Sequence, residues 1–358
     1  MSNTPNGTDE KTFAKQVDFD NLTTVVSKEF QLEQSLMEEG IPTYYLKWPQ
    51  ETKQAFLRLL KNLEPSGFIA VLRKQEGRIV LRIAPKPLAK KSNILINWLL
   101  FLATIATTFI TGWMLSEDRV DPLVGGVTFT IAIMAILGLH ELGHKLAANR
   151  SGVDATAPYF IPGPPPIGEM LGIGTFGAVI MQKSLPPNKD ALFDIGSSGP
   201  ILSFVLAIVA STIGLALSPL KYSSEVLPTL PTPFMLYFLI RVMFPNPVAP
   251  PPGQYAYIML HPVAFAGWVG MLVTMLNLVP AAMLDGGHVA RSLFGEKVRL
   301  VLTAVSIVAL FLVSPVMAVF VLIMAFYKHP GPLDDVSSLS TGRKLLTIGL
   351  VAILVLCF

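Results

Sequence analysis

The residues with the clearest capacity for chemistry form the run His140-Glu141-Leu142-Gly143-His144. On a helix, positions i and i+4 share one face, so both imidazoles can reach one zinc ion. Glu141 is offset by one position, where its carboxylate can take a proton from water that zinc activates. An ionisable group inside an apolar span costs about 2.5 kcal/mol or more, so a purely structural role explains this run poorly. The pattern predicts a catalytic zinc site with Glu141 as its base.

A catalytic zinc ion takes three protein ligands and keeps one position open, so a third ligand must come from elsewhere. Acidic or histidine residues in or beside the other apolar stretches are few: Asp194, His261, Asp285 and His288. His261 is at the far end of its stretch, and Asp194 has the position of a helix-start residue. Asp285 precedes Gly286-Gly287, where the backbone can bend to aim a carboxylate. We expect Asp285 to be the third ligand, with His288 as the alternative.

The elements that must position these residues are membrane-spanning helices. Of the 358 residues, 52% are hydrophobic and only 14% are charged, whereas soluble proteins average about 25% charged residues. Residues 1–91 hold 14 Lys/Arg and 11 Asp/Glu, but residues 92–358 hold only 13 of each. The chain therefore divides near residue 92. The net charge of +3 is too small and dispersed to indicate nucleic-acid binding, and a single cysteine excludes an intrachain disulfide.

About six spans are expected between residues 92 and 358, and the catalytic core is expected over about 123–295. A helix needs about 20 apolar residues to cross the hydrocarbon core. Four stretches meet this requirement: 92–116, 123–148, 195–220 and 255–280. The uncharged stretch 300–327 contains Pro315 and is read as one kinked helix or a hairpin of two short helices. The closing stretch 345–358 is barely long enough to span the membrane, and does so only if Arg343 and Lys344 extend to the membrane surface.

Ahead of the spans, we expect a disordered tail over 1–20 and a small soluble α+β domain over 21–91. Residues 20–40 read as a helix that ends at Gly40, and a second helix follows Pro49 with Phe56, Leu59, Leu60 and Leu63 on one face. Two short strands, 67–73 and 78–84, then form a hairpin. The first eleven residues lack the apolar run of a signal peptide, so export of this domain by that route is not expected.

Lysine and arginine near the span ends indicate the orientation. Lys86, Lys90 and Lys91 precede the first span, whereas Glu117, Asp118 and Asp121 outnumber Arg119 after it. Because basic residues collect on the cytoplasmic side, the N-terminal domain is expected to be cytoplasmic. The stretches after the second and fourth spans are also basic, as this orientation requires: Lys145, Arg150, Lys183 and Lys189, then Arg291, Lys297 and Arg299. We expect an integral, multi-pass membrane protein.

Residues 157–182 are apolar but rich in proline and glycine, so they cannot form a straight spanning helix. Non-helical backbone at membrane depth occurs only against protein or a watery cavity. We therefore expect strands and a re-entrant loop that line a cleft, where an unwound substrate helix can add as a further strand. A simple surface loop is the alternative.

Several motifs together resemble the site-2 protease family of intramembrane zinc metalloproteases, peptidase family M50. HELGH is followed by GTFGA (174–178), GSSGP (196–200) and an Asn277-x-x-Pro280-x-x-x-Leu284-Asp285-Gly-Gly motif, and the match covers roughly residues 123–295. HPVAFAGWVG (261–270) and the PLDDV and GRK runs near 332–344 are similar to the branch found in plant chloroplasts, cyanobacteria and archaea. Many family members carry a PDZ domain between catalytic spans, and the short link 186–190 leaves no room for one.

This resemblance implies His140, His144 and Asp285 as zinc ligands and Glu141 as catalytic base. It also implies that Asn277 helps to hold the substrate or the oxyanion, although a structural hydrogen bond is an equally good reading. The implied substrates are single-span membrane proteins, cut in regulated intramembrane proteolysis. Neither the resemblance nor the residues fix the oligomeric state, the substrate identity or the membrane.

Two other functions fit parts of the sequence. Gly196-Ser197-Ser198-Gly199 matches the nucleophile loop of a rhomboid-like serine protease, with His261 or His288 as base, but this reading leaves HELGH unexplained. A metal or ion transporter would also use histidines and carboxylates within the membrane, and would use broken helices. A transporter needs weak sites in series, whereas three clustered ligands beside a glutamate suit catalysis better.

Overall fold

The computed structural model describes residues 19–87, 93–116, 120–167, 172–245, 250–313, 315–327 and 329–358. The chain forms two compact units: one contains the residues up to Leu88 together with Leu333–Ser338, and the other contains Ala89–Pro332 and Leu339–Phe358. Most of the expected tail over 1–20 lies outside the described residues. So do Lys90, Lys91, Glu117, Asp118 and Arg119, which the orientation argument used.

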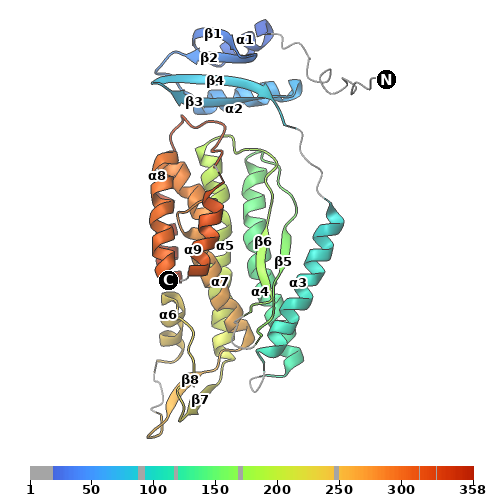
Figure 1. The fold of residues 1–358 in the computed structure, drawn as a ribbon, viewed down its shortest axis with the longest axis vertical. Coiled ribbons are helices and arrows are strands. Elements are labelled where there is room, and N and C mark those ends of the chain that lie inside the picture. Colours follow the sequence, from blue (N-terminus) through green and yellow to red (C-terminus); the bar gives the residue numbers. More distant parts are fainter. Residues whose placement is uncertain are drawn as a thin grey trace, which may run out of the picture. The chain divides into compact units, whose positions relative to one another are not determined.

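The first unit contains an antiparallel four-stranded sheet in the order β1-β2-β4-β3 (Figure 1). Its elements are α1 (Phe19–Ser27), β1 (Leu32–Glu38), β2 (Ile41–Leu46), α2 (Lys53–Leu63), β3 (Phe68–Gln75) and β4 (Arg78–Pro85), with a 3-10 turn over Glu64–Ser66. As the apolar spacing predicted, α2 buries Phe56, Leu59 and Leu63. The predicted hairpin of 67–73 and 78–84 is present as β3 and β4.

The helix expected over residues 20–40 is wrong beyond Ser27. Residues 32–46 instead form a hairpin, with β1 paired to β2 and positive φ angles at Glu39 (49°) and Gly40 (77°) in its turn. The β1 sequence LEQSLME consists mainly of good helix formers, so local propensity favoured a helix. Pairing with β2, whose Thr43 and Tyr44 are fully buried, overrides that propensity. Gly40 is a turn residue here and not a helix stop.

The outer edge of β3 is covered by the distant segment Leu333–Ser338 of the same unit. The Leu72 amide donates to the Leu333 carbonyl (2.9 Å), and the Asp335 amide donates to the Leu72 carbonyl (3.2 Å). Asp334 is fully buried and accepts hydrogen bonds from the amides of Val336 and Ser337 at 2.8 and 2.9 Å. This segment therefore extends the sheet by a short parallel pairing, Leu72 with Asp334.

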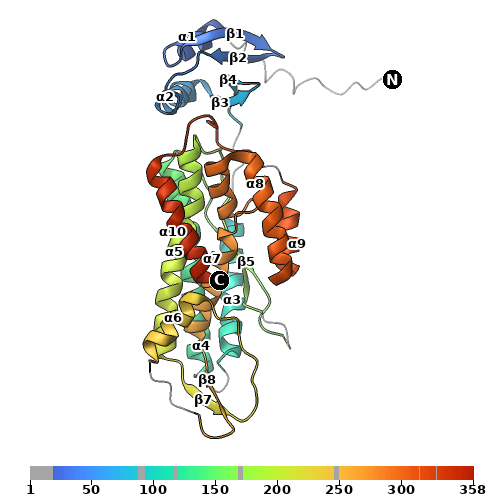
Figure 2. The ribbon, with the colours of Figure 1, turned by 90° about the vertical axis from the view of Figure 1, so that its left-hand side faces the viewer.

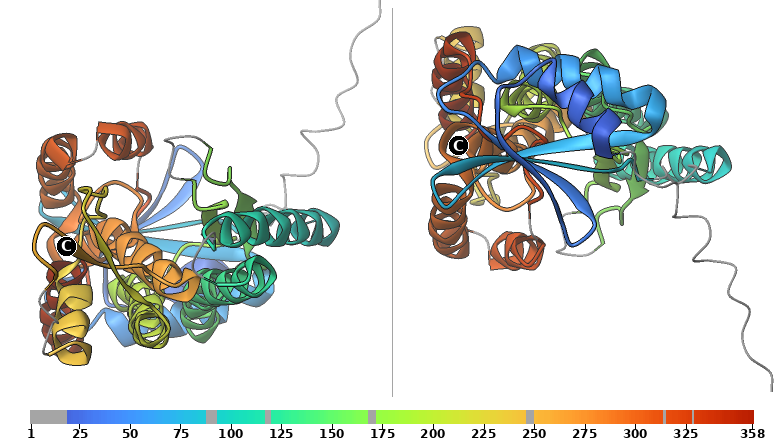
Figure 3. Two further views of the ribbon diagram at one scale, coloured as in Figure 1. Left: turned by 90° about the horizontal axis from the view of Figure 1, so that it is seen from below. Right: turned by 90° about the horizontal axis from the view of Figure 1, so that it is seen from above.

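Among the described residues of the second unit, three helices are long and apolar enough to cross a membrane: α3 (Ile94–Met114), α4 (Pro122–Arg150) and α5 (Lys189–Ala216). They correspond to the first three predicted spans. The fourth predicted span, 255–280, is shorter than expected because β8 (Tyr255–Ile258) occupies its start and α7 covers only Pro262–Leu278. α5 packs against α4, α7 and α8, and α3 lies at the periphery of the bundle beside α4 (Figure 3).

The stretch after Asp285 forms two helices that pack side by side (Figure 1). α8 spans Asp285–Val313 but is broken at Gly295, whose φ of 80° and ψ of −176° are not helical, and α9 spans Pro315–Ala325. Of the two arrangements expected for residues 300–327, the paired helices are therefore the one adopted.

The last helix, α10 (Thr341–Cys357), is too short to match the three long helices. α6 (Phe234–Met243) packs against it and lies below its C-terminal end in Figures 1 and 2. Cys357 of α10 and Leu236 of α6 are buried in the same apolar cluster. Neither of the two short helices is long enough to cross a membrane alone, but packed together they form one apolar column. The strand β7 (Leu220–Ser223) pairs with β8 beyond α6.

The strands expected within 157–182 are present as the antiparallel pair β5 (Tyr159–Pro162) and β6 (Thr175–Val179). Side chains of α3 hold this pair. The Asn97 amide donates to the carbonyls of Ala157 and Pro158 at 3.2 and 3.0 Å, and the Thr107 hydroxyl donates to the Gly174 carbonyl at 2.7 Å. Gly174 has a φ of 75°, and a Cβ there would meet the backbone of α3, so glycine permits this close approach.

Candidate active site

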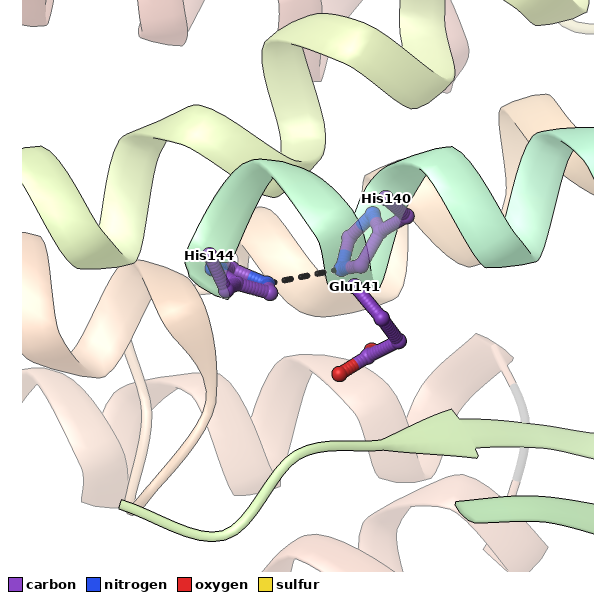
Figure 4. Close-up of side chains that lie close together, drawn as sticks. All are labelled: His140, Glu141 and His144. Atoms are coloured by element: carbon purple, nitrogen blue, oxygen red, sulfur yellow. Dashed lines mark hydrogen bonds between the residues drawn. The ribbon is translucent and has the colours of Figure 1, made fainter. Parts of the chain in front are cut away.

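The two histidines of HELGH lie one turn apart on α4 and are both buried, with 3% and 6% of their surface exposed. Their Nε2 atoms are 3.0 Å apart (Figure 4). The helix that carries them packs closely against α5, because Gly143 leaves room for the backbone of Ser198. The i, i+4 spacing thus brings both imidazoles to one point between helices.

Asp285, the first residue of α8, reaches the same point. Its Oδ2 lies 3.2 Å from Nε2 of His140 and 3.3 Å from Nε2 of His144. A tight turn between α7 and α8 makes this possible: a Cβ on Gly286 would overlap the Leu278 carbonyl, and one on Gly287 would press on the backbone of Ala281 and Ala282. The two glycines therefore let α8 begin directly beside the histidines.

The other third-ligand candidates are engaged elsewhere. Nδ1 of His288 lies 2.7 Å from Nε2 of His329, and the Asp194 carboxylate accepts a hydrogen bond of 2.7 Å from Nε of Arg343. His261 caps α7, where its Nδ1 accepts from the Val263 amide. The structure thus brings Asp285, and none of these three, to the histidine pair.

The outer ring nitrogens of the two histidines have different partners. Nδ1 of His144 lies 2.6 Å from the Ile195 carbonyl; since a carbonyl only accepts, this nitrogen must carry the proton. Nδ1 of His140 lies 3.0 Å from the Ser203 hydroxyl, which in turn lies 2.8 Å from the Thr274 hydroxyl. Such outer partners fix the tautomer and orientation of metal-binding histidines.

The donor set fits a zinc ion. With the proton on Nδ1, each neutral imidazole directs the Nε2 lone pair at the other ring and at the Asp285 carboxylate, which also only accepts. Three acceptors that face one another need a cation between them. Tetrahedral zinc, with ligands about 2.0–2.1 Å away, holds its donor atoms roughly 3.3 Å apart, and the three distances here are 3.0, 3.2 and 3.3 Å.

Glu141 follows His140 on α4 and points in a different direction from the imidazoles. Its carboxylate extends away from the helix toward the strand pair β5–β6 (Figure 4), and an oxygen lies within 4.8 Å of the ring nitrogens of His140 and His144. The backbone amide of Ile180, directly after β6, interacts with this carboxylate. Glu141 is thus held between the histidine pair and the end of a strand.

Asn277 also reaches the site, from the last turn of α7. Its amide nitrogen is 3.4 Å from Nε2 of His140. The sequence singled out Asn277 but missed Ser203 and Thr274, which are both fully buried beside it. One signal was available: Ser203 is seven residues after Gly196 and four after Gly199, on the α5 face that packs closely against its neighbours. Thr274 lies one helical turn before Asn277.

Small residues allow close helix packing at the site itself. A Cβ on Gly199 would overlap the imidazole of His144. Ser197 and Ser198, the candidate nucleophiles of a serine protease, are both within α5 and donate to the carbonyls of Asp194 and Ile195 at 3.4 and 3.1 Å. Across the described ranges, neither hydroxyl is bonded to a histidine, so a serine mechanism has no base here.

Comparison with known proteins gives a consistent result. A family model described as "Peptidase family M50" matches residues 128–322. The relatives include "Probable zinc metalloprotease EGY2, chloroplastic" of Oryza sativa subsp. indica, 26% identical over 248 residues, which are 66% of this chain and 44% of the relative. The corresponding EGY1 protein of Arabidopsis thaliana is 31% identical over 247 residues, 66% of this chain and 42% of the relative. No solved structure matches significantly.

The chain spans less than half of the length of these curated relatives. The family model covers most of the second unit, because it begins within α4 and ends within α9. All residues that form the site described above fall inside these limits.

Proposed function

Because the chain belongs to peptidase family M50, we propose that it is an intramembrane zinc endopeptidase that cuts single-span membrane proteins. His140, His144 and Asp285 hold the zinc ion, and Glu141 is the catalytic base. One observation carries the proposal: three acceptor atoms from α4 and α8 lie 3.0–3.3 Å apart in a buried setting. A cation bound between these atoms makes their convergence favourable.

A bound zinc ion supplies Lewis acidity and makes water nucleophilic at neutral pH. The chain contributes the proton transfers. The Glu141 carboxylate takes the proton of the attacking water and delivers it to the amide nitrogen that leaves. The Asn277 side-chain amide, beside His140, donates to the oxygen of the peptide carbonyl as negative charge develops on it. The helices around the site shield the buried hydroxyls of Ser203 and Thr274 from bulk water.

The substrate enters as an extended strand beside β6. A helical peptide bond is protected by its own hydrogen bonds, so the substrate must unwind, and an unwound segment needs new partners within the membrane. Among the described elements, β6 pairs with β5 along one edge, and Phe176 in β6 is 74% exposed. Pairing of the substrate with β6 satisfies its backbone and brings it to Glu141, which interacts with Ile180 at the end of that strand.

About six spans and a cytoplasmic first unit complete the proposal. α3, α4 and α5 cross fully, and α7, the α8–α9 pair, and α10 with α6 provide the remainder. Four basic residues, Lys145, Arg150, Lys183 and Lys189, support the orientation. Arg291 and Arg299 carry less weight than the sequence suggested, because both are buried and ion-paired with Glu296. Protease treatment of sealed vesicles tests this: digestion of the first unit only in inside-out vesicles is expected, and digestion only in right-side-out vesicles contradicts it.

Cleavage of a single-span test substrate tests the activity. Wild type is expected to cut it, Glu141→Gln to be inactive, and a zinc chelator to abolish the wild-type activity. Ser198→Ala is the control and is expected to remain active. An active Glu141→Gln together with an inactive Ser198→Ala overturns the zinc mechanism, and metal flux through vesicles without cleavage identifies a transporter instead.

A further inference from the structure

We propose that Ser203 and Thr274 form a positioning relay that holds the proton of His140 on Nδ1 and so aims Nε2 at the metal. This inference rests on the proposed function, because it assigns residues to the orientation of a zinc ligand. Ser203 lies on α5 and Thr274 on α7, so the relay joins three helices. Both hydroxyls are fully buried.

The direction of the hydrogen bonds follows from their end point. The Thr274 hydroxyl donates to the Gly270 carbonyl at 2.8 Å. Its oxygen can then accept from Ser203, 2.8 Å away, or Ser203 can donate to the Pro200 carbonyl at 3.2 Å. In both arrangements the Ser203 hydroxyl donates its own proton elsewhere. Its oxygen therefore accepts a hydrogen bond from Nδ1–H of His140, at 3.0 Å. The relay therefore leaves Nε2 of His140 free to bind metal.

The two zinc-binding histidines differ in how this orientation is secured. His144 is oriented by the Ile195 backbone carbonyl, which no substitution of a side chain removes. His140 depends on two side-chain hydroxyls, and each can be deleted separately. His140 is thus the ligand whose orientation can be tested by mutation, with His144 as an internal reference.

Zinc affinity measured by competition with a chelator tests the relay without relying on cleavage. Ser203→Ala is expected to weaken zinc binding about 10–100-fold, the range for loss of an outer partner of a metal ligand. Ser211→Ala is the matched control: Ser211 is on the same helix, is fully buried, and its hydroxyl has no hydrogen-bond partner among the described residues. Its zinc affinity is expected to equal that of wild type.

Thr274 provides a second, shape-preserving test. Thr274→Val removes the hydroxyl and is expected to weaken zinc binding less than Ser203→Ala, because Ser203 can still donate to the Pro200 carbonyl. Thr274→Ser keeps the hydroxyl and is expected to retain nearly wild-type affinity. The double variant Ser203→Ala/Thr274→Val is expected to bind zinc no more weakly than Ser203→Ala alone, since Thr274 acts through Ser203.

The visible spectrum of the cobalt-substituted protein gives a readout that a purely packing role does not change. Ser203→Ala and Thr274→Val are expected to alter it, and Ser211→Ala and Thr274→Ser to leave it unchanged. Wild-type zinc affinity and spectrum in Ser203→Ala overturn the relay while cleavage by wild type still supports the proposed function. Equal losses in Ser203→Ala and Ser211→Ala also overturn it, because they indicate general destabilisation. A wild type that neither binds zinc nor cleaves overturns the proposed function itself.

Discussion

Buried polar side chains are satisfied differently in two regions of the spanning helices. On α3, the hydroxyls of Thr104, Thr108 and Thr111 each donate to a carbonyl four residues earlier in the same helix, at 2.8, 2.7 and 2.9 Å. Where α4, α5 and α7 meet, hydroxyls that bond within their own helix also bond across helices, as Ser203 does with His140. The first arrangement is complete within one helix, and the second needs all three.

The two regions differ in a way that distinguishes a metal site from a spanning helix whose polar groups are all hydrogen-bonded. A threonine that bonds to its own helix leaves no demand for a ligand, however deeply it is buried. The histidine pair and Asp285 are different: when each Nδ1–H donates to its outer partner, the two Nε2 lone pairs and the Asp285 carboxylate face one another. Convergent acceptors without donors, and not the number of polar residues, therefore distinguish the proposed metal site. Four predictions follow from this distinction.

The largest effect is expected for Asp285→Ala. It leaves two neutral imidazoles without the carboxylate that completes the ligand set, so zinc should no longer copurify with the protein. Activity should fall at least as far as when the base is removed, by about 10²–10⁴-fold. Metal analysis and cleavage of a single-span substrate measure both losses. Asp194→Asn, which changes a nearby carboxylate that does not reach the histidines, should keep its zinc; zinc retained in Asp285→Ala would remove Asp285 from the ligand set.

Glu141→Gln should separate chemistry from metal binding. The amide has nearly the same shape but cannot take a proton, so activity should drop about 10²–10⁴-fold while the zinc content stays that of wild type. The two quantities are measured on the same purified sample. Loss of zinc in this variant would show that Glu141 is a ligand and not the base.

Gly199→Ala should disturb the site through packing alone. Its methyl group would overlap the His144 imidazole, and a ligand displaced by about 1 Å can cost about 100-fold in rate. Gly349→Ala in α10 is the control, because a Cβ there meets nothing within 4 Å. Cleavage rates of both variants, measured with saturating zinc, test the prediction; equal rates would mean that the helices shift apart without cost.

The smallest effect is expected on α3. Thr108→Val removes a hydroxyl that bonds only within its helix, so activity should stay within about twofold of wild type and stability should change little. Thr107→Val additionally removes the bond to Gly174 and should raise the KM for substrate, because β6 is held less firmly. Steady-state kinetics of the two variants measure the difference; an equally large effect of Thr108→Val would contradict the comparison.

The sequence predicted those parts of the fold that depend on local pattern. The charge-free stretches correspond to α3, α4 and α5, and the proline-rich stretch 157–182 contains the strands β5 and β6. The family resemblance is confirmed by the matching family model. The hairpin β1–β2 was missed, because Leu, Glu and Met in β1 favour a helix until β2 pairs with them. The break in α8 at Gly295 was missed because one glycine among charged residues carries no clear signal.

The site residues also divide into those that local spacing predicts and those that depend on tertiary contacts. The spacing of His140 and His144 fixes their common face without any knowledge of the fold. The approach of Asp285 depends on the turn between α7 and α8, so the sequence left His288 open as an alternative. Ser203 and Thr274 could not be distinguished by residue type from the threonines of α3. Only their additional partners on other helices distinguish these two hydroxyls.

The pairing of Leu333–Ser338 with β3 has a consequence for biosynthesis. Arg73 in β3 donates to the carbonyl of Leu333, 260 residues later in the chain. At about 5–20 residues per second, the ribosome needs roughly 13–50 s to make the intervening chain. During translation the outer edge of β3 therefore stays unpaired. Such an unpaired strand edge aggregates or recruits chaperones. A nascent chain released before residue 333 lacks the segment that covers this edge. The unpaired edge then distinguishes the truncated chain from the complete one for cellular quality control.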